Sequence, residues 1–272
     1  MEIQFGAEHF NKVATTYEPP ATAQSSPIAR SLIAFAPPIS QESIVLDNAS
    51  GPGTITTEIL KQIAPDDTAP RIYAADVSPA MIEVLRQKKL PGVISDVMDA
   101  MELSYANDTF THSFMNMAIF LLPDPEKGAA EIYRTLKPGG VAVITSIKYV
   151  GWVRIFQAAQ QEVKPGAPLW KGLMKEEWAT EQKLKSVVQA GGFKPENIDT
   201  KSTESRQPSS MLGNFLLSIK DAATQMITKD WTEAETQHFE VVLEEQIEKE
   251  LSSSHEFEII LWVALATKEV AS

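Results

Sequence analysis

The sequence predicts an α/β protein in which helices cover both faces of a doubly wound, mainly parallel β-sheet. Short apolar, β-branched runs alternate with helical stretches between residues 43 and 147, which is the pattern of parallel strands joined by helices. The first run ends in Asp47 and is followed by Gly51 and Gly53 before a helix, as at the ligand-binding edge of α/β sheets. The 272 residues, 43% of them hydrophobic, provide a core for one large domain or one domain with a lid.

The expected strands are the short apolar runs, taken in chain order. Five of them occupy residues 43–47, 71–76, 92–95, 110–117 and 141–147. A sixth is expected near 193–200, and a seventh at 256–268 is apolar enough to return to the interior of the sheet. The polar stretch 201–210 between these last two strands is interpreted as a loop.

Caps and prolines mark the expected helices. An amphipathic helix begins at Ser26-Pro27, and Pro37-Pro38 ends it. Residues 54–63 follow the glycine pair, and Ser78-Pro79 supplies the N-cap of the next helix. Asp124-Pro125 begins a helix that ends at residue 136, before a Lys-Pro-Gly-Gly turn. Later helices are expected near 152–162 and 176–190, with two more between 211 and 250.

The composition excludes several classes of protein. With 24 Lys and Arg against 36 Asp and Glu, the chain has a net charge of −12 and lacks the cationic surface that nonspecific nucleic-acid binding requires. The absence of cysteine excludes disulfide scaffolds and thiolate metal sites. The apolar runs 117–122 and 259–266 are too short to span a bilayer, and no targeting segment is apparent. We therefore expect a soluble, cytoplasmic protein with no membrane span and no nucleic-acid partner.

The strand–turn–helix at residues 45–60 carries the strongest functional signal. Gly51 and Gly53 would let a ligand lie directly on the main chain, facing an open helix N-terminus. Asp76 closes the next strand at about the spacing at which a carboxylate meets the ribose hydroxyls of a nucleotide. The third glycine of the dinucleotide pattern is replaced by Thr56, so NAD is not well supported. A tight turn that merely requires glycine remains the structural alternative for this motif alone.

Five successive segments resemble the motifs of class I S-adenosylmethionine-dependent methyltransferases: LDNASGPG, YAADVSPAMIEVL, SDVMDAMEL, FTHSFMNMAIFLLPDPEKGAAEIYRTLKPGG and VAVITS. The resemblance covers roughly residues 9–160. More narrowly, residues 46–49, the strand containing Thr111 and His112, and residues 151–170 resemble fungal small-molecule methyltransferases of the gliotoxin S-methyltransferase kind. The family resemblance implies a Rossmann-like, seven-stranded doubly wound sheet whose last strand is antiparallel, with an α-helical lid.

This resemblance also implies how the chain is divided. Residues 1–38 would form an N-terminal helical arm or lid, and residues 39–150 the cofactor-binding methyltransferase core. Residues 151–272 would supply further helical lid and substrate segments together with the final strands of the sheet.

The same resemblance implies cofactor-binding roles for residues at the strand ends and in the arm. Around the methionine part of S-adenosylmethionine it places Tyr17, Asp47, Ser50, Gly51 and Gly53. It places Asp76 at the ribose, Val77 and Met81 against the adenine, Asp96 at the adenine amino group, and Val97 and Met98 over the ring. Asn116 and Met117 would lie near the transferred methyl group.

Methyl transfer from a sulfonium needs alignment, desolvation and sometimes a base, so no metal is expected. His9, in the arm, is the candidate base for a hydroxyl acceptor, whereas His112 is expected to be a packed sheet residue. The candidate acceptor-lining residues are apolar: Phe10, Phe120, Trp152, Phe156, Leu169 and Trp170. An apolar, cation-poor pocket would favour a neutral hydrophobic acceptor, methylated at sulfur or oxygen, in secondary metabolism.

Three other functions are compatible with the sequence. The FNKVATTY opening is similar to that of ubiquinone-pathway methyltransferases, so a quinone or lipid precursor is an alternative acceptor. A methyltransferase-like protein without activity could regulate a partner through the acidic helix at 233–250, although a solvated amphipathic helix is the favoured explanation of that segment. The pocket could also serve a rearrangement or cyclisation. The sequence does not determine the oligomeric state.

Overall fold

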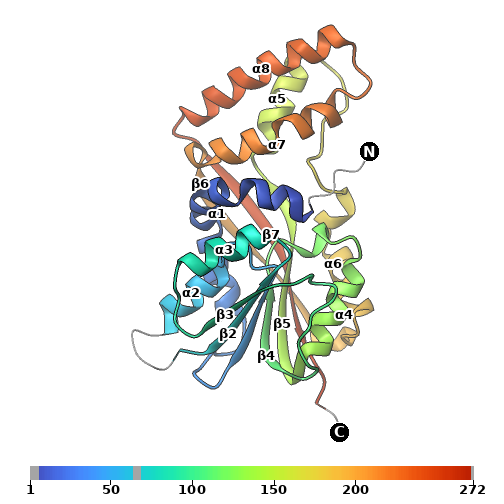
Figure 1. Cartoon of the computed structure of the whole chain (residues 1–272). Helices are drawn as coiled ribbons and strands as arrows, with labels where there is room; N and C mark the ends of the chain where they lie inside the picture. The colour runs from blue at the N-terminus through green and yellow to red at the C-terminus, as the bar shows by residue number, and fades with distance from the viewer. Residues whose placement is uncertain (1–5, 64–68, 271–272) are drawn as a thin grey trace.

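A single seven-stranded sheet forms the centre of the molecule (Figure 1). The computed structural model describes residues 6–63 and 69–270, with the backbone alone at 13, 15–24 and 63. The strand order is β3-β2-β1-β4-β5-β7-β6. The strands are β1 (Ile44–Asn48), β2 (Arg71–Asp76), β3 (Val93–Val97), β4 (Phe110–Met115), β5 (Leu136–Val150), β6 (Ile198–Pro208) and β7 (Glu256–Thr267). Strands β1 to β5 pair in parallel, and β7 is antiparallel to both of its neighbours, which confirms the expected sheet.

Helices cover both faces of this sheet, as the alternation of strands and helices predicts. One face carries α1 (Ala7–Phe35), α2 (Thr54–Ile63) and α3 (Pro79–Gln87), and the other carries α4 (Pro125–Thr135) and α6 (Glu181–Ala190) (Figure 1). A further layer lies at one end of the sheet and contains α5 (Val153–Val163), α7 (Gly213–Ile227) and α8 (Glu233–Leu251). Short 3₁₀ turns lie at Ile119–Leu121, Glu176–Ala179, Pro195–Asn197 and Ser209–Leu212.

Strand alternation divides the core into two hydrophobic clusters. On β1, Val45 faces the cluster shared with α1, α2 and α7, whereas Leu46 faces the cluster shared with α4 and α6. Both side chains are fully buried, because successive residues of a central strand point to opposite covered faces. In the part of the chain that the structure describes, none of the helices has the length and apolar character required to cross a membrane.

The expectation of a loop at 201–210 is wrong. Strand β6 begins at Ile198, later than expected, and continues through this polar stretch to Pro208, paired with β7 along its length. Its inward residues Thr203, Ser205 and Gln207 are buried and small or polar, and Gln207 donates a hydrogen bond to Ser205 at 2.7 Å. The alternation of buried and exposed positions is therefore present, but polar side chains conceal it from a hydrophobicity pattern.

Helix α1 is longer than the sequence suggests. The helix expected to start at Ser26 begins at Ala7 and continues through Pro27, although proline lacks the donor that an interior helical position needs. Tertiary contacts account for part of this extension, since α1 packs against α2, α3, α7 and β6. Asn11 also reaches the start of α3, where its Oδ1 accepts from Ser78 Oγ at 2.7 Å and from Ala80 N at 3.3 Å.

Candidate cofactor and acceptor site

The carboxyl ends of β1 and β2 are joined by two aspartates that bind backbone amides. Asp47 Oδ2 accepts from Thr56 N at 3.0 Å and from Thr56 Oγ1 at 2.7 Å. Asp76 Oδ2 accepts from Gly51 N, and its Oδ1 from Ser78 N, both at 2.8 Å. The two carboxylates thus fix the loop between β1 and α2, and each retains lone pairs for a ligand.

The loop itself requires glycine for two different reasons. Gly51 has φ +53° and a Cβ added there would meet nothing within 4 Å, so this stretch of backbone is open to a ligand. Gly53 has φ +79°, and an added Cβ would lie 2.4 Å from Leu85 Cδ1. Both conformations are left-handed and favour glycine, which supports the reading of a built main-chain cradle.

Burial alters the electrostatics of both acids. The pKa of Asp47 is raised to about 7, chiefly because the side chain is buried, and the hydrogen bonds from Thr56 oppose that shift only in part. Burial also raises the pKa of Asp76, against the hydrogen bonds from Ser78 and Gly51. A cationic ligand group would favour the charged form of both carboxyls.

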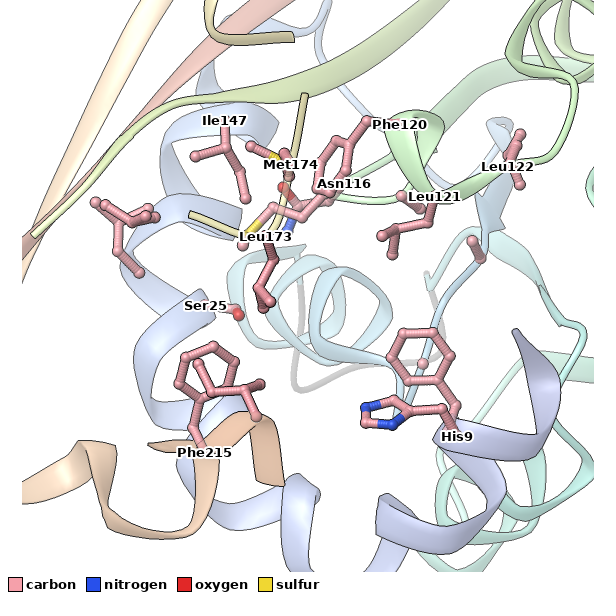
Figure 2. Close-up of a pocket in the computed structure, with 18 of the residues that line it drawn as sticks. His9, Ser25, Asn116, Phe120, Leu121, Leu122, Ile147, Leu173, Met174 and Phe215 are labelled. Atoms are coloured by element: carbon pink, nitrogen blue, oxygen red, sulfur yellow. The ribbon is translucent and has the colours of Figure 1, made fainter. Parts of the chain in front are cut away.

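A continuous cavity of about 810 Å³ opens beside these strand ends. That volume lies in the upper part of the range of about 300 to 1,000 Å³ typical of small-molecule sites. Nine of the expected cofactor residues line the cavity: Asp47, Ser50, Gly51, Asp76, Val77, Met81, Met98, Asn116 and Met117. Figure 2 shows Asn116 and Phe120 on one side of the cavity and His9 of α1 on the other.

Three expected cofactor residues do not line this cavity: Gly53, Asp96 and Val97. The side chain of Tyr17 lies outside the described part of the chain. Asp96 lies within β3, and Tyr105 donates to its Oδ2 at 3.4 Å. The acid that reaches the cavity is instead Asp99, whose Oδ1 accepts from Met101 N at 2.8 Å.

The signal for Asp99 was present in the sequence. The segment SDVMDAMEL contains two acids three residues apart, and β3 ends at Val97. In parallel sheets the ligand side begins where the strand ends, so the acid after the strand end is the better placed of the two. The expected strand, 92–95, ended two residues too early, and that made Asp96 the first acid after it.

The expected acceptor-lining residues divide into two groups. Phe10, Phe120 and Trp152 line the cavity, and Phe156, Leu169 and Trp170 do not. Phe156 and Trp170 pack behind Trp152, with ring centroids 6.0 and 6.2 Å from that indole. Sequence reasoning missed two parts of the wall. Phe215 and Ile219 come from α7, and Leu173 and Met174 come from the loop before the 3₁₀ turn η2 (Glu176–Ala179).

The two histidines have different environments. His9 lines the cavity in edge-to-face contact with Phe10, with ring centroids 5.3 Å apart. Burial and, to a smaller extent, Lys12 lower its pKa, so its imidazole is neutral near pH 7. His112 lies within β4, with Nε2 3.2 Å from the Pro37 carbonyl oxygen, and is a packed sheet residue as expected.

The lining contains more cations than the sequence suggested. Besides the three aspartates it includes Lys148, Arg154, Lys171 and Lys175, with Glu176, so the expectation of a cation-poor pocket does not hold. Among the described residues, no group of three or more His, Asp or Glu side chains is arranged to hold a metal ion.

Comparisons with known proteins agree with this geometry. Residues 46–144 match the model of a methyltransferase domain. "Methyltransferase ktnA" of Aspergillus niger is 24% identical over 227 residues, covering 74% of each chain, and "Methyltransferase ucsB" of an Acremonium species is 27% identical over 59% of each. A chloroplastic 2-methyl-6-phytyl-1,4-hydroquinone methyltransferase of Oryza sativa is 34% identical over 42% of this chain and 32% of its own length.

Solved structures show the same fold at low identity. The [4+2]-cyclase SpnF is 16% identical, with a TM-score of 0.54 over 90% of this chain and 82% of its own. A phosphoethanolamine N-methyltransferase of Haemonchus contortus, in complex with S-adenosyl-L-methionine, is 16% identical with a TM-score of 0.53 over 89% of this chain and 53% of its own.

The matched region contains most of β1, all of β2, β3 and β4, and most of β5, with the loops that follow Asp47 and Asp76. Residues 46–144 therefore form a methyltransferase domain, and the matches to ktnA and ucsB support a class I S-adenosylmethionine-dependent methyltransferase. The aligned regions of the fungal relatives ktnA and ucsB cover 74% and 59% of this chain.

Proposed function

We propose that this protein methylates a small, largely apolar molecule at sulfur or oxygen, in fungal-type secondary metabolism in the cytoplasm. The observation that carries the proposal is the single cavity in which the strand-end aspartates face one part and an apolar wall from α1, α7 and residues 173–174 faces the other. Such a cavity accommodates a polar cofactor and an apolar acceptor side by side. The relatives ktnA and ucsB, both methyltransferases from fungi, support methyl transfer as the reaction.

The residues present fit S-adenosylmethionine. Asp47, Ser50 and Gly51 would hold its methionine part, and Asp76 its ribose, since both aspartates have unused acceptor capacity and Gly51 exposes bare backbone to the cavity. Val77, Met81 and Met98 would enclose the adenine, with Asp99 as the acceptor for its amino group in place of Asp96. When bound, the cofactor supplies a methyl group already activated by a sulfonium.

The chain's own contribution to the reaction would be alignment and control of one proton. Phe10, Phe120 and Trp152 would exclude water around the acceptor. His9 would take the proton of an acceptor hydroxyl on Nδ1 or Nε2, because its lowered pKa keeps the imidazole unprotonated near pH 7. A thiol acceptor would need less help, since a thiolate is accessible near that pH.

One other function has a specific observation in its favour. The rice hydroquinone methyltransferase favours a quinone or lipid precursor as the acceptor. The similarity in fold to a [4+2]-cyclase shows that this architecture also occurs in an enzyme of another reaction class. At 16% identity, this similarity is evidence for the fold but not for the reaction. A regulatory protein without activity would have no need to keep the Gly51, Asp76 and Asp99 cradle open to the cavity.

Calorimetry with S-adenosylhomocysteine, with NAD as the control, is the first test. Binding of the former alone at micromolar or lower concentration supports the cofactor assignment. Thiols, phenols and hydroquinones are then screened for a mass gain of one methylene group in the presence of S-adenosylmethionine. Product formation only with hydroquinones would transfer the proposal to the quinone alternative, and no binding of S-adenosylhomocysteine would contradict it.

A further inference from the structure

The charged residues that line the cavity come from different parts of the chain. The three aspartates of the lining come from β1, β2 and the segment after β3, whereas its cations come from residues 148–175. In a chain of net charge −12, four cationic side chains in the lining of one cavity, Lys148, Arg154, Lys171 and Lys175, are not expected from composition. These cations therefore carry information about the ligand that the cavity binds.

Two of these cations are engaged by the protein. Arg154 Nη1 donates to Glu250 Oε2 at 2.9 Å and its Nη2 pairs with Oε1. The same buried carboxylate accepts from Ser209, so Arg154 links α5 to α8. Lys175 also has a partner. Lys148 and Lys171 are the two lining cations that no ion pair joins to a carboxylate among the described residues.

Lys148 is oriented by the strand and by an indole. The register of β5 against β7 shifts between Ile147 and Tyr149, so Lys148 lies in a β-bulge, a feature that redirects side chains near functional sites. Its Nζ lies 4.2 Å from the ring centroid of Trp262. Trp262 is itself held by a hydrogen bond of 2.8 Å from Nε1 to the Ala179 carbonyl oxygen. The ammonium is thus preorganised by a cation–π contact.

Lys171 extends from an anchored backbone. Trp170 N donates to Gln160 Oε1 at 2.9 Å, and Gln157 Nε2 donates to the Trp170 carbonyl oxygen at 2.8 Å. Two side chains of α5 therefore fix the main chain directly before Lys171. This residue lines the cavity from a segment with little freedom to move away.

Much of the cavity lining besides these lysines is apolar. Ile147, Val150, Trp152, Leu173, Phe215 and Ile259 line the cavity and belong to, or pack against, the hydrophobic cluster shared with α1, α2 and α7. Figure 2 shows Ile147, Leu173 and Phe215 directed into the cavity from three separate segments. An apolar wall with two cations fits a molecule that has an apolar body and one anionic group.

We infer that the acceptor is an organic anion, with an apolar body against Leu173 and Phe215 and an acidic group, such as a carboxylate, bound by Lys148 and Lys171. This inference rests on the proposed function, because it specifies the acceptor of the same site. The aspartates repel the acidic group and the lysines attract it, so the charge pattern sets the direction in which the acceptor enters.

A matched pair of fluorescent probes tests this inference. 8-Anilinonaphthalene-1-sulfonate and N-phenyl-1-naphthylamine have the same rings, and only the first is anionic. Each is titrated into the protein saturated with S-adenosylhomocysteine. The variant Leu173→Trp narrows the cavity and serves as a control. Any probe that still binds to this variant is counted as bound outside the cavity. We expect the anionic probe to bind in the cavity about tenfold more tightly than the neutral one, with a preference that falls as salt is raised.

Variants of the two lysines test whether Lys148 and Lys171 cause the preference for the anionic probe. Lys148→Met with Lys171→Met should weaken binding of the anionic probe about tenfold and leave the neutral probe unchanged. Lys249→Met, an exposed position on α8 that does not line the cavity, is the control and should change neither. Equal affinity for both probes in the cavity, or an anionic preference that survives the double substitution, overturns the inference. Calorimetry on the same samples separates the two proposals, since a protein that does not bind S-adenosylhomocysteine fails the proposed function instead.

Discussion

The hydroxyl group of Thr145 fixes Asn116 in position at the end of β4. Thr145 Oγ1 donates to Asn116 Oδ1 at 3.0 Å and accepts from Met117 N at 2.7 Å. Met117 has φ +56°, a left-handed conformation that costs a non-glycine residue free energy. Because Thr145 is fully buried on β5, one strand holds the strained end of its neighbour, where both Asn116 and Met117 line the cavity.

Replacing Thr145 with valine should therefore affect both stability and ligand binding. The change preserves shape but leaves Met117 N and Asn116 Oδ1 without this partner, at about 1 to 3 kcal/mol for each buried unsatisfied group. We expect a lower urea midpoint and weaker binding of S-adenosylhomocysteine. Thr145→Ser retains the hydroxyl and should remain close to the wild type in both measurements. Equal behaviour of the two variants would show that the hydroxyl does not position this turn.

Removal of the Asp76 carboxylate should weaken cofactor binding. Asp76→Ala deletes the proposed ribose acceptor and the partner of Gly51 N, and charge-assisted hydrogen bonds contribute about 1.5 to 3 kcal/mol each. Calorimetry should show a loss of affinity for S-adenosylhomocysteine of at least about tenfold. Asp76→Asn, which keeps one carbonyl oxygen, should lie between the wild type and the alanine variant. Unchanged affinity in a folded Asp76→Ala protein would refute the ribose assignment.

Asp47 should make stability depend on pH in an unusual direction. Its pKa is about 7 in the folded protein and 3.8 ordinarily, so the folded state holds the proton over a range in which the unfolded chain has lost it. The free energy of unfolding of the wild type should therefore fall, relative to Asp47→Asn, as the pH rises from about 4 to about 7. Denaturant titrations of both proteins at several pH values measure this difference. A free energy of unfolding of the wild type that rises with pH relative to Asp47→Asn would contradict the raised pKa of Asp47.

The same group should couple cofactor binding to proton release. If the ammonium group of S-adenosylhomocysteine lies near Asp47, it lowers the pKa of this carboxyl group. At a pH of about 6.5, binding should therefore release the proton that the carboxyl group holds in the free protein. The apparent binding enthalpy should then differ between phosphate and Tris buffers in the wild type. In Asp47→Asn that part of the difference should disappear.

The contact between Asn11 and the start of α3 should slow the release of bound cofactor. Asn11 Oδ1 accepts hydrogen bonds from Ser78 Oγ and Ala80 N, which lie directly after the end of β2 at Asp76. These bonds attach the cavity-lining end of α1 to the start of α3. Asn11→Ala should increase the dissociation rate of S-adenosylhomocysteine several-fold, as expected for loss of about 1 kcal/mol, in stopped-flow measurements. Lys12→Ala, which removes an exposed ion pair with Glu8, is the control and should have little effect.

Most of the sheet could be predicted from the sequence because its central strands are buried on both faces. Such strands are continuous apolar runs between turn residues, and β1, β2 and β4 have this pattern. Most of strand β6 was not predicted, because this edge strand has the polar residues Thr203, Ser205 and Gln207 at its inward positions. The full length of helix α1 was not predicted, in part because its prolines disfavour a helix in the local sequence. Contacts with distant elements favour the helix.

The cofactor side of the cavity was more accessible to prediction than the acceptor side. Asp47, Gly51 and Asp76 lie within short strand–turn–helix units, where local spacing determines which residues converge. Phe215 and Leu173 reach the cavity only after α7 and the segment before η2 have folded over the sheet. No local pattern brings those residues together, so the acceptor wall depends on tertiary structure.

Strand β7 is synthesised after both β5 and β6, yet it occupies the interior position between them. Nascent chains emerge from the ribosome N-terminus first, at about 5 to 20 residues per second, so β5 waits with one edge unpaired until residues 256–267 have emerged. An unpaired apolar edge promotes aggregation. A premature stop codon just before Glu256 would therefore preserve the strand-end loops proposed to bind the cofactor, but it would leave β6 unpaired and β5 paired only with β4. Such a chain would depend on chaperones or be degraded.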